Sequence, residues 1–233
     1  MALNDPFQLF LILLFFAAFS LFSYKKNLLD LEGVLIANAV GLAAITYGPN
    51  PLQDLGIVVI FFIIGEIASN FPRKKHEQRN IWNVVGNSLP SLIMLILIVP
   101  FPEKAFLLEI GFFGAISAAL ADTLSSEVGY YSKKDPIMIT TFKRVPRGTD
   151  GGITLLGEIA ALFGGLVIGV SHYLIYSNPF AAIVIIIAGL VGSNTDSLFG
   201  ALFETKKLMD NTQVNLIGST AGAIFTLLLG LLI

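Results

Sequence analysis

The chain alternates along its whole length between long apolar stretches and short polar connections. Eight apolar stretches approach the roughly 20 residues that a helix needs to cross a bilayer, and they cover residues 7–24, 31–47, 55–71, 82–100, 105–126, 152–176, 180–203 and 214–233. This pattern predicts an all-α, polytopic transmembrane helical bundle of about eight spans, in which residues 1–233 form a single integral membrane domain. The first stretch follows Asn4 and Asp5 and not a basic segment, so we expect a retained helix.

The connections between the stretches fall into two classes. Three are short reversals punctuated by proline, at Asn50-Pro51, at residues 100–102 and at Asn178-Pro179. The other four carry thirteen of the fourteen basic residues, which are Lys25, Lys26, Arg73, Lys74, Lys75, Arg79, Lys133, Lys134, Lys143, Arg144, Arg147, Lys206 and Lys207. Only Lys104 falls on the other side. The positive-inside rule therefore predicts four cytoplasmic basic connections and both termini outside.

One connection, residues 128–151 between the fifth and sixth stretches, is too polar for the membrane and too long for a simple reversal. Loops of this length in compact domains are commonly functional. We expect it to be a long cytoplasmic loop that takes part in the function.

Composition narrows the class further. With 55% hydrophobic and 13% charged residues, the chain is too apolar for a soluble domain of 233 residues. A net charge of −2 suggests no nucleic-acid partner. The chain has no cysteine and only two histidines, His76 and His172, which excludes thiolate and histidine-rich metal sites. A metal site would therefore use oxygen ligands.

Several carboxylates lie within the apolar stretches or directly at their ends, where an unpaired charge in a membrane helix costs several kcal/mol. They include Glu66, Asp122, Glu127, Glu158, Asp196 and Glu204. Each of these six is near the end of its stretch that adjoins a basic connection. Asp122 shares a helical face with Ser125 and Ser126, and Glu127 is one step round. Such hard oxygen ligands suit Mg²⁺. The alternative is that they are interfacial carboxylates, exposed to water or paired with arginine.

The segment KRVPRGTDGGIT at residues 143–154 leads directly into the sixth stretch. Its glycines allow close backbone approach, and successive amides at a helix N-terminus form a phosphate site. Arg144 and Arg147 could add bidentate phosphate contacts. Alternatively, Thr149 or Asp150 caps the helix and the arginines only set the orientation. The chain contains no Walker A or kinase glycine-rich pattern, so a nucleotide site here must be of another type.

Polar residues also interrupt the fourth, seventh and eighth stretches. GSNTDS at residues 192–197 should face the bundle interior or a hydrated cavity. Hydrogen bonding between helices would explain its small residues but not Asp196. Asn83 and Asn87 lie four residues apart on one face, as do Asn211 and Asn215. These amides could bind a base, a ribose or a metal-bound water, or they could be structural bridges.

Four motifs occur in order along the chain: DTLSSE at 122–127, PRGTDGG at 146–152, NTDSLFG at 194–200 and NLIG at 215–218. Together they resemble the integral-membrane family of plant phytyl-phosphate kinase and its archaeal and bacterial relatives, over nearly the whole chain. The resemblance implies phosphorylation of a prenyl monophosphate, such as phytyl or geranylgeranyl phosphate, to the diphosphate. The wider group, with phytol kinase, dolichol kinase and phosphatidate cytidylyltransferase, commonly uses CTP with Mg²⁺.

The resemblance also implies a division of roles, with lipid entering from the bilayer and nucleotide from the cytoplasm. The expected catalytic residues are Asp122, Asp150, Asp196 and Arg147. The expected Mg²⁺ ligands are Asp122, Glu127, Asp150 and Asp196. The expected nucleotide- and phosphate-binding residues are Arg79, Asn83, Asn87, Lys143, Arg144, Arg147, Gly148, Thr149, Gly151, Gly152 and Asn215.

Two other classes of function remain open on sequence alone. A transporter of ions or organic anions could also use intramembrane carboxylates beside polar helix breaks, although these residues crowd toward one face. A related lipid enzyme, either a prenol kinase or a CTP-dependent cytidylyltransferase, would share the same residue types. A homo-oligomer is compatible with each class.

Overall fold

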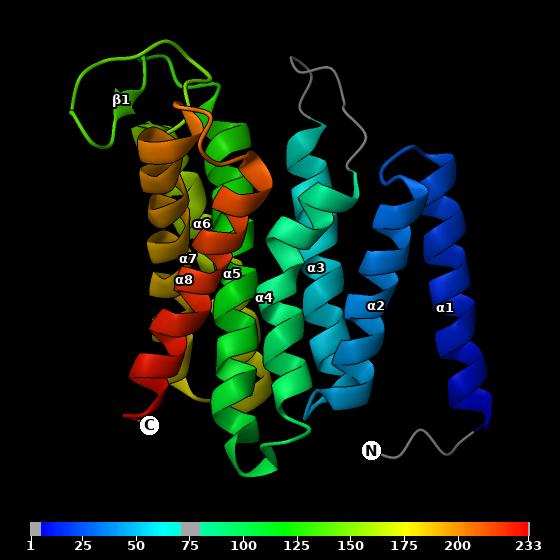
Figure 1. The fold of residues 1–233 in the computed structure, drawn as a ribbon. Helices are drawn as coiled ribbons and strands as arrows, with labels where there is room; N and C mark the ends of the chain where they lie inside the picture. Colours follow the sequence, from blue (N-terminus) through cyan, green and yellow to red (C-terminus); the bar gives the residue numbers. More distant parts are fainter. Residues whose placement is uncertain (1–5, 71–79, 233) are drawn as a thin grey trace.

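The computed structural model describes residues 6–70 and 80–232, and this part of the chain forms eight α-helices, with a long loop between the fifth and the sixth (Figure 1). The helices are α1 (Pro6–Lys25), α2 (Leu31–Tyr47), α3 (Pro51–Ser69), α4 (Ile81–Leu97), α5 (Ala105–Gly129), α6 (Leu155–Tyr176), α7 (Pro179–Phe199) and α8 (Asn211–Gly230). Six of the helical segments are long and apolar enough to cross a membrane, while α2 and α4, at 17 residues each, are shorter. The predicted all-α polytopic bundle is confirmed.

Helix α5 is the centre of the bundle. It packs against α3, α4, α6, α7 and α8, and every residue from Leu108 to Ala121 is buried. Helix α1 lies at the opposite extreme, at the edge of the bundle beside α2, with Ser23 as its one buried residue (Figure 1). The chain therefore has a tightly packed half around α5 and a looser half that ends in α1.

Small residues let the helices of the packed half approach closely. A Cβ added to Gly164 would lie 2.9 Å from the Cα of Ala121, and one added to Gly222 would lie 2.6 Å from the Cβ of Ala118. Membrane helices associate through such close backbone contact because lipid provides little hydrophobic driving force. This packing fixes the ends of α5, α6, α7 and α8 relative to one another.

Helix α4 is hydrogen-bonded to α8 one turn before a proline. Pro90 lies inside α4 and has no backbone N–H, which frees the carbonyl of Gly86 four residues earlier. The hydroxyl of Ser219 on α8 donates a hydrogen bond to this carbonyl at 3.1 Å. Gly86 also lacks a side chain where a Cβ would lie 2.9 Å from the carbonyl oxygen of Thr212. The two helices are thereby held together beside Asn87.

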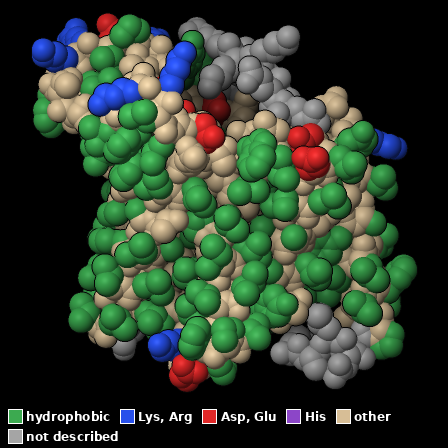
Figure 2. Space-filling view, in the orientation of Figure 1, with side chains coloured by type: hydrophobic (Ala, Val, Ile, Leu, Met, Phe, Trp, Pro, Cys, Tyr) green, Lys and Arg blue, Asp and Glu red, His purple; other side chains and the backbone are tan. Residues whose placement is uncertain are grey.

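The two ends of the bundle differ in charge. We call the end that carries residues 130–154, Lys25, Lys26, Lys206 and Lys207 the basic end; the connections 48–50, 98–104 and 177–178 lie at the other end, the hairpin end. Most Lys and Arg side chains in Figure 2 gather at the basic end. Figure 1 places the start of α1 and the end of α8 at the hairpin end. The orientation of the bundle across the membrane stays a prediction.

The loop at the basic end has structure of its own. Strand β1 (Ile137–Met138) pairs in antiparallel fashion with β2 (Gly152–Ile153), and Ile137 also forms a bridge with Arg144. The backbone N–H of Ile139 donates to the carbonyl of Gly151 at 3.0 Å. These hydrogen bonds fold the loop back on itself over the ends of the helices.

The hairpin end holds a buried polar cluster that was not expected from the sequence. Asp54 on α3 and Glu109 on α5 are 0% and 2% exposed. The hydroxyl of Tyr176 donates a hydrogen bond to Glu109. The side-chain amide of Asn50 donates to Tyr176 at 2.7 Å, and its backbone N–H donates to Asp54 at 3.1 Å. The carboxylates of the apolar helices are therefore not confined to the basic end.

Candidate functional site

A polar cavity of about 840 Å³ opens at the basic end, between the ends of α4, α5, α7 and α8 and the loop that precedes α6. We call it the polar chamber. Figure 2 shows acidic side chains in the hollow beside the loop. In a bundle whose outer surface is almost entirely apolar, this is where water and a charged ligand can reach the helix ends.

Most of the predicted site residues line the polar chamber. They are Asn83, Asn87, Asp122, Glu127, Arg147, Gly148, Thr149, Asp150, Gly151, Gly152, Asp196 and Asn215. They come from four helices and the loop, so only the tertiary fold brings them together.

Two of the predicted residues that the structure describes do not join this wall. Lys143 and Arg144 are exposed on the loop, where the carbonyl of Lys143 accepts a hydrogen bond from Met138 and Arg144 forms the bridge with Ile137. Arg79 lies outside the described residues. On the wall of the polar chamber, Arg147 is thus the one cationic side chain among the residues that the structure describes.

Five carboxylates line the polar chamber, those of Asp122, Glu127, Asp150, Asp196 and Glu204. The carboxyl groups of Asp122 on α5 and Asp196 on α7 lie within hydrogen-bonding reach of each other, and the charges of Glu204 and Asp150 also act on Asp196. One carboxylate oxygen of Asp196, Oδ2, is buried and receives no hydrogen bond from any described residue. Several like charges in a partly dry site repel one another strongly unless a cation balances them.

The carboxylate pair suits a hydrated cation. Within residues 6–70 and 80–232, no three acidic or histidine side chains converge to form a complete metal cage. Mg²⁺ does not need one, because it commonly binds one or two protein carboxylates and completes its shell with water and substrate phosphates. Asp122 and the unpartnered oxygen of Asp196 match that requirement.

The loop reaches the polar chamber through two glycines with left-handed backbone, Gly148 at φ +79° and Gly151 at φ +76°. Gly148 has no atom near the position of a Cβ, whereas a Cβ on Gly151 would lie 2.4 Å from that of Ala201. Gly148 is therefore open to a ligand and Gly151 docks the loop against the end of α7. The hydroxyl of Thr149 donates a hydrogen bond to the carbonyl of Pro146 at 2.7 Å, which holds the turn from Pro146 to Thr149.

Helix α6 is capped by a residue other than the two considered from the sequence. The side chain of Thr154 accepts a hydrogen bond from the backbone N–H of Gly157 at 3.0 Å, so Thr154 is the N-cap. Thr149 and Asp150 precede this cap and line the polar chamber. The alternative that either of them serves only to cap the helix is wrong.

Helix α7 ends in a short π-helical segment, η2 (Gly200–Glu204), in which the N–H of Thr205 bonds to the carbonyl of Gly200 at 3.1 Å. Such π-segments are frequent at functional sites because they redirect side chains at a helix end. This one places Glu204 on the wall of the polar chamber. Glu204 and Asn211 are wall residues that the predicted site omitted, and only the irregular end of α7 explains the position of Glu204.

Some asparagines have structural partners. The side-chain oxygen of Asn83 accepts from the N–H of Asn80 at 3.0 Å as part of a capping box. Asn194 donates to Glu158 on α6 at 3.0 Å, which is the interhelical hydrogen bonding considered for this segment. Asn83 still lines the polar chamber, so its structural bond does not remove it from the site.

Comparison with known proteins places the chain in a family. A model of the integral membrane protein family DUF92 matches residues 14–223. An uncharacterised membrane protein of Methanocaldococcus jannaschii is 34% identical over 229 residues, which cover 95% of this chain and 94% of that protein. The chloroplastic protein VTE6 of Arabidopsis thaliana is 29% identical over 211 residues, which cover 83% of this chain and 63% of that protein. Protein PGR of the same plant is 26% identical over 238 residues, with 88% and 82% covered. No solved structure matches the chain. The chain therefore belongs to the DUF92 family of integral membrane proteins.

Proposed function

We propose that this protein is a prenyl-phosphate kinase. It transfers a phosphoryl group from a nucleoside triphosphate, with CTP as the expected donor, to an isoprenoid monophosphate held in the bilayer. The observation that carries the proposal is the polar chamber, in which one arginine and a glycine-bearing loop face a cluster of carboxylates at the end of a membrane bundle. The four motifs that resemble the plant phytyl-phosphate kinase family support it, as does the similarity to a chloroplastic plant relative.

The loop residues would bind phosphate. Arg147 projects the positive charge and planar donors that phosphate oxygens favour. Gly148 has no side chain, and no atom lies within 4 Å of the position that a Cβ would take, so phosphate can approach its backbone closely. The exposed Lys143 and Arg144 lie on the same loop and would attract the nucleotide over a longer range.

The carboxylates would hold Mg²⁺. Asp122 and Asp196 would contact the ion directly, while Asp150 and Glu127, which line the same wall, would act through water. When bound, Mg²⁺ neutralises phosphate charge and fixes the orientation of the donor. These carboxylates repel one another, and a bound cation would relieve that repulsion. The clustered negative charge is therefore what the chain itself contributes to binding the ion.

In the reaction, an oxygen of the acceptor phosphate forms a bond to the γ-phosphorus of the donor. The bond from that phosphorus to the β,γ-bridging oxygen breaks, and the nucleoside diphosphate leaves with the electron pair. A phosphomonoester is already ionised near neutral pH, so alignment and charge balance matter more than a strong base. The chain supplies both through Arg147, the loop amides and the carboxylate pair.

The proposal places this reaction on the cytoplasmic side of the host membrane. Thirteen of the fourteen basic residues belong to the connections assigned to that side. The nucleotide would then enter from the cytoplasm and the acceptor from the bilayer.

The test is product analysis. Purified protein in lipid nanodiscs is incubated with phytyl or geranylgeranyl phosphate, Mg²⁺ and each nucleoside triphosphate in turn, and the products are identified by mass spectrometry. Prenyl diphosphate with nucleoside diphosphate is expected. Lack of diphosphate with every donor and over a range of chain lengths would contradict the proposal.

Other products would indicate other functions. Monophosphate formed from free prenol would indicate a prenol kinase, and a cytidylyl lipid formed with pyrophosphate would indicate a cytidylyltransferase. Uptake by proteoliposomes without nucleotide consumption would indicate a transporter.

A further inference from the structure

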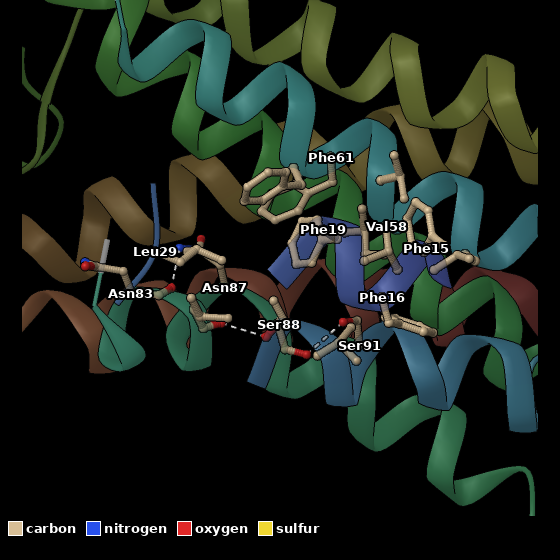
Figure 3. A pocket seen from close by; sticks show the side chains of 18 residues that line it. Phe15, Phe16, Phe19, Leu29, Val58, Phe61, Asn83, Asn87, Ser88 and Ser91 are labelled. Carbon is tan, nitrogen blue, oxygen red and sulfur yellow. Dashed lines mark hydrogen bonds between the residues drawn. The ribbon is translucent and has the colours of Figure 1, made fainter. Parts of the chain in front are cut away.

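A second cavity adjoins the polar chamber on the side of α1 and extends along the helices into the bundle (Figure 3). We call it the apolar groove. Helices α1, α2, α3 and α4 form most of it, with Leu29 from the α1–α2 connection and Ile116 from α5. Phenylalanine rings make up much of its wall, and α4 provides all four of its polar side chains. Those four are Asn83, Asn87, Ser88 and Ser91.

The polar side chains of α4 do not make the groove polar along its length. The hydroxyl of Ser88 donates to the carbonyl of Val84 at 2.6 Å, and that of Ser91 donates to the carbonyl of Ser88 at 2.7 Å. Both hydroxyls are thus satisfied within their own helix. The groove beyond Asn87 presents an apolar surface to an occupant.

Asn83 and Asn87 line both cavities. They stand where the polar chamber and the apolar groove meet, one turn apart on the same face of α4. A molecule with a charged head and an apolar tail could therefore extend from one cavity into the other past these two amides. Neither cavity alone offers this combination.

We propose that the apolar groove holds the isoprenoid chain of the acceptor, while its phosphate passes Asn83 and Asn87 into the polar chamber. The proposal rests on the proposed function, since it names the place of that acceptor. From Asn83 to Ser91 the groove follows α4 for two turns, about 12 Å at 1.5 Å per residue. This is less than half of the roughly 30 Å hydrocarbon thickness, so the tail would enter from within one leaflet.

Helix α1 forms the outer wall of the groove and is its least buried element. Its contacts include a hydrogen bond from Asn38 on α2 to the hydroxyl of Ser20 at 2.7 Å, and the edge-on packing of the Phe19 ring against Phe62 of α3 with centroids 5.1 Å apart. The free space in the groove is about 70 Å³, room for a few water molecules at roughly 10–15 Å³ each. An isoprenoid chain therefore requires α1 to move outward.

The groove would act on chain position more than on overall affinity. Lipid tails are as apolar as the phenylalanines of the wall, so transfer of the chain from bilayer to groove gains little from the hydrophobic effect. The effect of the groove would be on position: a branched chain that fits its wall would be held so that the phosphate is aligned in the polar chamber. Chain length and branching are then the properties that the groove selects.

The test is photo-crosslinking of the unmodified protein in nanodiscs. A geranylgeranyl phosphate analogue with a diazirine near the end of its tail is photolysed, and the labelled peptides are identified by mass spectrometry. Labelling of the groove, at positions such as Phe19 on α1 and Val58 on α3, is expected, with suppression by unlabelled geranylgeranyl phosphate. Labels on the outer faces of α6 and α7, or labels that unlabelled geranylgeranyl phosphate does not suppress, would overturn the proposal.

A matched pair of glycine variants tests the same groove by filling it. A Cβ on Gly41 would lie 2.9 Å from the Phe16 ring inside the groove, while one on Gly56 would meet no atom within 4 Å. Gly41→Leu is expected to reduce groove labelling about tenfold, equivalent to about 1.4 kcal/mol, and Gly56→Leu to leave it unchanged. Equal labelling in both variants would contradict the proposal.

These outcomes separate the groove from the reaction. Groove labelling without any diphosphate product would remove the kinase but keep the lipid site. Diphosphate product with labels elsewhere would keep the kinase and remove the groove. If Gly41→Leu fails to fold, the labelling map of the unmodified protein decides alone.

Discussion

The two left-handed glycines of the loop make the sharpest test of how the loop is held over the polar chamber. Alanine at Gly148 or Gly151 costs about 1–2 kcal/mol because a left-handed backbone brings Cβ against the following carbonyl. At Gly148 nothing further is in the way, but at Gly151 the new methyl would lie 2.4 Å from the Ala201 Cβ and 2.6 Å from the Ser197 carbonyl oxygen. Overpacking of this kind costs about 1–3 kcal/mol more. We therefore expect about 1–2 kcal/mol for Gly148→Ala and about 2–5 kcal/mol for Gly151→Ala.

Limited proteolysis of the loop in nanodiscs measures this difference. When opening is fast relative to cleavage, the cleavage rate follows the population of open loop. An extra 1–3 kcal/mol corresponds to about a 5- to 150-fold larger open population, so the Gly151→Ala loop should be cleaved that much faster than the Gly148→Ala loop. The wild-type protein is the baseline. Equal cleavage of the two variants would refute the docking of Gly151 against the end of α7.

Three further predictions test other parts of the structure. Asp196→Asn should lower turnover at least about a hundredfold, because it removes an expected Mg²⁺ ligand, while the midpoint of thermal unfolding stays the same or rises as repulsion in the carboxylate cluster is relieved; near-normal turnover would remove the metal role. Tyr176→Phe deletes the hydroxyl that donates to the buried Glu109, and chemical denaturation should show a loss of about 1–3 kcal/mol; unchanged stability would show that this hydrogen bond does not hold the hairpin end together. Because the chain has no cysteine, a membrane-impermeant maleimide added to intact cells should label Lys104→Cys and not Lys134→Cys; the reverse labelling would contradict the predicted orientation.

The helices and most of the wall residues could be predicted because they depend on local patterns. Hydrophobic length fixed the number of helices, and proline marked the hairpins at Asn50-Pro51 and Asn178-Pro179. Polar residues such as Asp122 and Asp196 had to face inward because lipid is a poor solvent for charge. Their meeting in one chamber follows from the packing of α5 against α7, which small residues allow.

Other features could not be predicted because they depend on tertiary contacts or on irregular backbone. Arg144 resembles Arg147 in sequence, but the bridge to Ile137 keeps it in the outer part of the loop. Glu204 reaches the wall through the π-helical end of α7. The cluster of Asp54 and Glu109 joins helices that are distant in sequence, and no local motif marks it. The apolar groove likewise appears only when α1 to α4 are assembled.

In the proposed reaction, the γ-phosphoryl group of a nucleotide passes to a lipid phosphate in the polar chamber. The direct measurement follows CTP radiolabelled on its γ-phosphate through incubation with geranylgeranyl phosphate and Mg²⁺ in nanodiscs. Label should appear in geranylgeranyl diphosphate with the wild-type protein, and its appearance should be lost with Asp122→Asn, which removes one member of the carboxylate pair without changing its shape. Label that stays in CTP or appears only as inorganic phosphate would show that the protein does not transfer the γ-phosphoryl group to the lipid. Equal transfer by Asp122→Asn would show that the carboxylate pair is not needed for it.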